Sequence, residues 1–158
     1  MNYLNERLSK KKALENRTKR FAVACFGLLD SLPHTASLRI IGYQFGKSAS
    51  SIGANYREVN RAESKDDFVH KLGVVLKEAA ETVYWLEILR DLRPDAKEIE
   101  DLLAEAGELL RIFQAARLTL AGANKSKQSS NSPNTIEKSK NRQIEKSVNR
   151  QIDKSANR

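Results

Sequence analysis

The stretch SSIGANYREVNRAESKDDF, residues 50–68, decides the fold because it contains the end of one helical pattern and the start of the next. In its first half Ile52 and Val59 are seven residues apart, which is the repeat of a helix packed against other helices. In its second half Ser64 stands three residues before Asp67, an Asp version of the capping box that begins a helix. The stretch therefore predicts two consecutive helices joined near residues 61–64.

The seven-residue repeat extends along the chain in both directions from this junction. Four segments carry such rows, with Leu14, Phe21 and Leu28 in the first, Leu38, Phe45, Ile52 and Val59 in the second, Leu72, Ala79 and Leu86 in the third, and Ile99, Ala106 and Phe113 beside Leu103 and Leu110 in the fourth. Pro33 and Pro94 end the first and third segments, because proline interrupts a helix. Asp95 with Glu98 predicts the cap of the fourth segment, and Gly122 predicts its end.

These signals predict four helices at about 5–32, 37–61, 64–92 and 95–121. The connections are short, so consecutive helices are expected to be antiparallel neighbours. The predicted fold is all-α, an up-down-up-down four-helix bundle over residues 1–123. A surplus apolar face on the third helix, Val69, Leu76 and Val83, predicts either a deeply placed helix or a second subunit that covers it.

The chain changes character after residue 123. Residues 124–158 are rich in Asn, Lys, Ser and Gln, and an eight-residue repeat begins at Ile136, Ile144 and Ile152. One isoleucine per repeat cannot bury a core, so we expect a disordered, basic C-terminal tail. Net charge is uneven as well: +5 over residues 1–20, −3 over 21–123 and +6 over 124–158. Basic ends on a mildly acidic body predict arms that contact a polyanion.

The remaining composition argues for a cytoplasmic protein. Cys25 is the single cysteine, so no disulfide within the chain is possible and a reducing compartment is expected. Basic residues precede the apolar run FAVACFGLL, as in a signal peptide, but Glu6, Glu15 and Asp30 do not fit that pattern. No run approaches the roughly 18 apolar residues of a membrane span. We therefore expect no membrane role.

A polar constellation lies on the second and third predicted helices and has two interpretations. Buried carboxylates could act as acid and base, or the groups could form a hydrogen-bonded seam that fixes the register of the helices. The structural interpretation is favoured, because no cleft with pKa-separated groups is visible in the sequence. The predicted seam consists of Ser48, Asn55, Glu58, Arg61 and Glu81. Small residues on the second helix, Gly42, Gly46 and Gly53 among them, predict close approach of helix backbones.

Metal, cofactor and catalytic sites have no positive signal. A di-iron bundle needs two Glu-x-x-His motifs, whereas this chain offers one Asp67-x-x-His70. His34, in a predicted loop, is expected at the surface. Phosphate-binding glycine loops, zinc-ligand spacings and nucleophile elbows are absent from the sequence. We expect no metal, no cofactor and no enzymatic activity.

A basic cluster in the first helix is the strongest functional signal. It is either a binding surface for nucleic acid, through release of counterions from phosphates, or a solvated face that keeps the protein soluble. The residues predicted to bind RNA or DNA are Lys10, Lys11, Lys12, Arg17, Lys19 and Arg20.

The segment from residue 50 to residue 89 resembles a family of four-helix bundles encoded in intervening sequences of bacterial large-subunit ribosomal RNA genes. The resemblance covers about residues 13–123, and its most specific part is Ser51-Ile52-x-Ala54-Asn55-x-x-Glu58, followed by Arg61 and by the segment 81–86. The accessory variability proteins of diversity-generating retroelements belong to the same family.

This resemblance implies a homopentameric barrel of bundles without catalytic activity, in which Asn55, Glu58 and Arg61 have a structural role. It also implies contact with nucleic acid and a reverse transcriptase through basic surface, which here is the Lys10–Arg20 cluster. Two functions are therefore expected: an oligomeric accessory protein that binds nucleic acid, associated with rRNA or with a retroelement reverse transcriptase, or a structural adaptor that binds protein partners.

Overall fold

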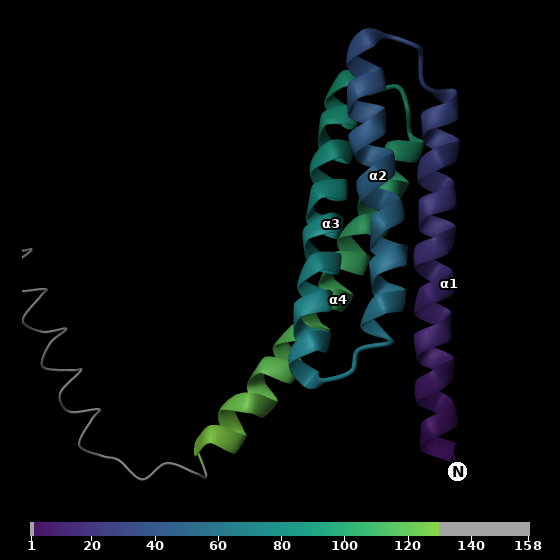
Figure 1. Ribbon diagram of the computed structural model, residues 1–158. Coiled ribbons are helices and arrows are strands. Elements are labelled where there is room, and N and C mark those ends of the chain that lie inside the picture. The colour runs from purple at the N-terminus through teal and green to yellow at the C-terminus, as the bar shows by residue number, and fades with distance from the viewer. Residues whose placement is uncertain (1, 130–158) are drawn as a thin grey trace, which may run out of the picture. The chain divides into compact units, whose positions relative to one another are not determined.

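The computed structural model describes the backbone of residues 2–129 and the side chains of residues 4–119. It contains α1 (Asn2–Ser31), α2 (Ala36–Val59), α3 (Lys65–Leu92) and α4 (Glu98–Ser129). Consecutive helices run in opposite directions and are joined by short connections at alternate ends (Figure 1). The predicted all-α, up-down-up-down bundle is confirmed for these residues. The predicted tail begins at residue 124, but α4 continues through Ser129. The remaining residues of the predicted tail, 130–158, lie outside the described residues.

One core runs along the inside of the four helices. The predicted rows supply it, since Phe21, Phe45, Ile52, Leu86 and Phe113 are all at most 3% exposed. Leu14 and Leu38, at the ends of their rows, and Phe68, near the start of α3, are half-buried and pack against this core. Heptad spacing keeps these side chains on one stripe of each helix, and burial of that stripe stabilises the bundle by roughly 1.5–3 kcal/mol per large apolar side chain.

Short polar side chains begin α2 and α3. Thr35 accepts a hydrogen bond from the backbone N–H of Leu38 at 3.3 Å, and Ser64 accepts one from Asp67 at 3.1 Å. The Asp67 carboxylate in turn accepts the N–H of Glu63 at 3.1 Å, so the predicted capping box at Ser64 is present with the return bond shifted by one residue. Such caps satisfy N–H groups that have no partner inside the helix.

The fourth helix differs from its prediction at both ends. Asp95 does not cap it, because its carboxylate binds the Arg93 guanidinium at 2.8 and 3.1 Å, and α4 begins only at Glu98. The expected stop at Gly122 is also wrong, since the helix continues to Ser129. A single glycine costs a helix only about 1 kcal/mol, and no proline follows until residue 133.

The inner stripe of α4 is rotated relative to the predicted rows. Leu102 and Leu109 are buried at 8% and 0% exposure, whereas Leu103 and Leu110 are half-buried at the edge of the core. Residues adjacent in sequence lie about 100° apart on a helix, so a leucine pair leaves open which member points inward.

Close packing of α1 on α2 depends on the glycines of α2. A Cβ atom added to Gly42 or Gly46 would lie 3.1 Å from methyl carbons of Leu29, and one added to Gly53 would lie 3.2 Å from the Thr18 hydroxyl. These distances are tighter than ordinary carbon contacts, so any side chain larger than glycine would displace α1 or its residues. The glycines of α2 therefore lie against side chains of α1; the predicted close approach of helix backbones stays a prediction.

Candidate nucleic-acid-binding surface

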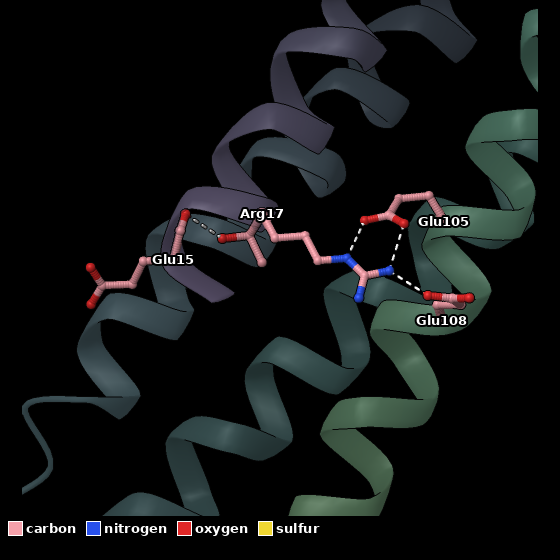
Figure 2. A network of polar contacts seen from close by, with 5 residues as sticks. Glu15, Arg17, Glu105 and Glu108 are labelled. Atoms are coloured by element: carbon pink, nitrogen blue, oxygen red, sulfur yellow. Dashed lines mark hydrogen bonds and ion pairs between the residues drawn. The ribbon is translucent and has the colours of Figure 1, made fainter. Parts of the chain in front are cut away.

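Arg17, one of the six predicted phosphate-binding residues, makes an ion cluster with α4. Its Nε and Nη2 donate to the Glu105 carboxylate at 2.6 and 2.7 Å, and Nη2 also donates to Glu108. Figure 2 shows the guanidinium reaching from α1 to these two carboxylates, while the Glu15 side chain points away on the other side of α1. The bidentate pair holds the pKa of Glu105 below its usual range, although partial burial opposes the shift. Arg17 thus joins the first helix to the last.

The other five predicted cations remain at or near the surface. Lys10 and Lys12 make ion pairs with Glu6 at 2.6 Å and Glu15 at 3.5 Å, yet both lysine side chains are more than 70% exposed. Exposed pairs of this kind contribute about 0–1 kcal/mol, so they leave the ammonium groups available to other anions. The three remaining cations are the half-buried Lys11 and the exposed Lys19 and Arg20.

The predicted polar seam is buried at one point, where α2 meets α3. Ser48 and Thr82 are 1% and 0% exposed, and their hydroxyl oxygens lie 3.1 Å apart. Ser48 donates to the carbonyl of Phe45 at 3.1 Å, and Thr82 lies 2.8 Å from the carbonyl of Glu78. Both hydroxyls therefore have partners in the core, as buried polar groups require.

The other seam residues do not join this pair. Glu58 and Arg61 bind each other at 2.8 Å, but their side chains are 53% and 72% exposed. Asn55 is half-buried and makes no side-chain hydrogen bond within the described residues. Glu81 accepts a hydrogen bond from the Trp85 indole at 3.3 Å. A continuous buried network is therefore absent from the described part of a single chain.

A polar contact near the junction of α2 and α1 was not predicted from the sequence. Asn60, just after α2, donates to the Glu15 carboxylate of α1 at 3.0 Å. Burial opposes ionisation of Glu15, but the hydrogen bonds from Asn60 and Lys12, together with the positive charges of Lys12 and Arg57, outweigh it and lower the pKa of Glu15. No periodic pattern marks this contact, because Asn60 follows the last turn of its helix. The ion cluster of Arg17 was missed as well, although Glu105 and Glu108, three residues apart on one face of α4, could have indicated a site for a cation.

The single thiol lies in the core and the two histidines lie at the surface. Cys25 is fully buried, and burial raises the pKa of its thiol to about 12. At neutral pH the thiolate that would act as a nucleophile is therefore scarce. His34 and His70 are exposed, as expected.

An open groove runs between α3 and α4. One part is lined by Leu76, Ala80, Leu110 and Leu118, and the adjoining part by Val69, Val74 and Lys77; Arg117 borders both parts. Two residues of the predicted surplus face, Leu76 and Val83, pack against the core, and Val69 lines the groove. The surplus face is therefore only partly covered within one chain.

Two further observations concern the described residues. They contain no group of three or more His, Cys, Asp or Glu side chains arranged to hold a metal ion. None of the described helices is long and apolar enough to cross a membrane.

Two comparisons with known proteins point to the same family. Residues 10–115 match the family model described as 23S rRNA-intervening sequence protein. A crystal structure of an S23 ribosomal protein family member from Bacteroides thetaiotaomicron, described as a protein with unknown function, is similar at 32% sequence identity and a TM-score of 0.60. The match covers 65% of this chain and 96% of that one. No curated protein matches the chain.

The matched segment contains the whole of α2 and α3, most of α1 and the part of α4 that contributes to the core. It therefore includes the Arg17 cluster, the Ser48–Thr82 pair and all six predicted cations. With a family model over two thirds of its length and a related fold in the crystal, this chain belongs to the 23S rRNA-intervening sequence protein family.

Proposed function

We propose that this protein is a non-enzymatic, oligomeric accessory protein that binds the phosphate backbone of nucleic acid in the cytoplasm. The partners that the family resemblance suggests are rRNA or a reverse transcriptase. One observation carries the proposal: residues 10–20 of α1 keep five of the six predicted basic side chains at or near the surface, and of these six only Arg17 is neutralised by carboxylates of another helix.

Physical arguments support binding through this array. Each phosphate that a lysine or arginine neutralises releases condensed counterions, so a basic row gives binding with little sequence preference and strong dependence on salt. An oligomer with closed symmetry would repeat the row in every subunit, and several weak contacts would then act together. The basic residues of the tail would add attraction as a tether without choosing the place of contact.

Fluorescence anisotropy with short RNA and DNA, at low and near-physiological salt, tests the proposal. The parent is expected to bind at low salt and to lose affinity steeply as salt rises. Changing Lys10, Lys11, Lys12, Lys19 and Arg20 to glutamine should nearly abolish binding, whereas removal of residues 124–158 should weaken it only in part. Arg17 is left unchanged because its substitution would disturb the fold. Absence of binding by the parent at low salt would reject the proposal, and complete loss with the tail would assign binding to the tail alone.

A second function, a structural adaptor that binds protein partners, is favoured by a different observation. Large apolar side chains remain on the outside of the bundle, with Ile40, Tyr43, Tyr84 and Leu118 at 67%, 70%, 54% and 72% exposure. Such side chains, with the groove between α3 and α4, are typical of surfaces that contact another protein.

Light scattering at micromolar concentration tests the assembly that both functions share. The expected mass is a multiple of the 17.8 kDa chain, and the family resemblance suggests five copies. A 17.8 kDa particle would contradict the oligomer. An oligomer that binds neither RNA nor DNA would favour the adaptor.

A further inference from the structure

We infer that the bound nucleic-acid strand follows the side of α1 that faces α2, with Lys12 and Lys19 as its main phosphate contacts, and not the side that faces α4. The inference rests on the proposed function, because it assigns that function to one of two chemically different sides of the same helix.

Contacts between helices fix the orientation of α1. Toward α2, Phe26 and Thr18 lie against Gly46 and Gly53, and Glu15 accepts the hydrogen bond from Asn60. Toward α4, Arg17 reaches Glu105 and Glu108. Figure 2 shows Glu15 and Arg17 leaving α1 on opposite sides.

Helical spacing then assigns each exposed cation to a side, since residues three, four or seven apart share a face. Lys12 precedes Glu15 by three residues, and Lys19 follows Glu15 by four and precedes Phe26 by seven. Both therefore belong to the α2 side.

The same spacing places the other cations beside Arg17. Lys10 precedes Arg17 by seven residues and Arg20 follows it by three, so both belong to the α4 side. Arg20 acts electrostatically on the Glu105 carboxyl and helps to lower its pKa, as this placement requires.

The two sides differ in the acidic groups that accompany these cations. On the α2 side the carboxylates of Glu15 and, further along α1, Asp30 are accompanied by the basic side chains of Lys11, Lys12, Lys19 and Arg57. On the α4 side, cations are outnumbered: Lys10, Arg17 and Arg20 stand with the carboxylates of Glu6, Asp101, Glu105 and Glu108. A phosphate that approached the α4 side would meet carboxylates, whereas the α2 side presents an excess of positive charge.

The spacing on the α2 side also suits a phosphate backbone. Lys12 and Lys19 are two helical turns apart, or about 10 Å along the axis at 1.5 Å per residue. The flexible stems of two lysines at this separation let both ammonium groups contact phosphates of one strand. Arg57 of α2 donates to the carbonyl of Gly53 at 2.7 Å, which keeps its guanidinium at this side.

Two matched double variants of the full-length chain test the inference. Lys12→Gln/Lys19→Gln changes the α2 side, and Lys10→Gln/Arg20→Gln changes the α4 side. Each variant removes two charges from the same stretch of α1 and releases one carboxylate, Glu15 or Glu6, from an exposed ion pair. Net charge is therefore equal, and circular dichroism checks that both variants remain folded.

We expect Lys12→Gln/Lys19→Gln to lower the affinity for a short single-stranded RNA by roughly tenfold or more. The slope of log affinity against log salt should become shallower by about 1.4, which corresponds to two fewer phosphate contacts on a single strand. Lys10→Gln/Arg20→Gln should change the affinity less than about twofold. Parallel titrations with DNA of the same sequence and with polyglutamate show whether the protein prefers RNA, binds any phosphodiester backbone or binds polyanions in general.

Lysine acetylation followed by mass spectrometry gives an independent readout, in which bound RNA should protect Lys12 and Lys19 but not Lys10. Equal losses in both variants, or protection of Lys10 alone, would overturn the choice of side while leaving nucleic-acid binding intact. A parent chain that binds neither RNA nor DNA would overturn the proposed function and this inference together.

Discussion

Arg17 belongs to a basic run in the sequence, yet its Nε and Nη2 are bound to two carboxylates of α4. In the sequence alone, nothing distinguishes Arg17 from the other five cations of that run. What separates Arg17 from the others is the helix that packs beside it, and that neighbour supplies Glu105 and Glu108. Charge counts along a sequence therefore overstate the number of side chains that a phosphate can reach.

Substitution of Arg17 should destabilise the bundle. Arg17→Met keeps a long apolar stem but leaves Glu105 and Glu108 without their cation, so we expect the free energy of unfolding to fall by roughly 1–2 kcal/mol. Partial exposure of the pair, 30% and 32% for the two side chains, keeps the effect at this level. Urea denaturation measures it. Arg20→Met, three residues further on, is the control and should stay within about 0.5 kcal/mol.

The stability difference between the parent and Arg17→Met should depend on pH. Because Arg17 lowers the pKa of Glu105 in the folded protein, its stabilisation is complete above the unfolded carboxyl pKa of about 4.3. The stabilisation is lost as the pH falls through the lower folded value. Urea melts at pH 7 and at progressively lower pH should show the two proteins converging. A constant difference across that range would contradict the ionic role of Arg17.

At the scale of elements, the packing of α1 on α2 depends on glycine at particular positions. Gly53 faces the buried Thr18, while Gly107 of α4 has nothing within 4 Å of an added Cβ. Gly107→Ala should raise stability by about 0.5–1 kcal/mol through helix propensity alone. Gly53→Ala should show no such gain, and a loss if Thr18 cannot move. Thermal melts of the two single variants measure this, and equal stabilisation would disprove the close contact.

The same comparison of elements shows how far sequence patterns predict this fold. Heptad rows predicted α1, α2 and α3 well, because Phe21, Ile52 and Leu86 obey a single period and caps such as Ser64 are local. The start of α4 was missed because Asp95 had a competing partner, Arg93, two residues away. For the candidate site, the sequence indicated which basic residues to consider but not which side of α1 each one occupies, because only tertiary contacts show which face of α1 meets α4.

At the scale of the whole molecule, Cys25 offers a measure of global opening. Its thiol is fully buried in the shared core, with a pKa of about 12. We expect a thiol reagent to modify it in the native state only at the rate at which the bundle unfolds. Labelling should accelerate in urea in parallel with loss of helical circular dichroism. Rapid labelling in native buffer would show that the core near Cys25 opens locally.

The link from Arg17 to Glu105 spans 88 residues, so it can form only after nearly the whole bundle has been synthesised. During translation α1, α2 and α3 leave the ribosome first, and Arg17 has no carboxylates on α4 to bind. The link therefore closes late, on a chain whose other helices already have neighbours. A contact that forms after the folding transition state slows unfolding while leaving the folding rate almost unchanged. We therefore expect Arg17 to affect how long the bundle persists once formed more than how fast it assembles.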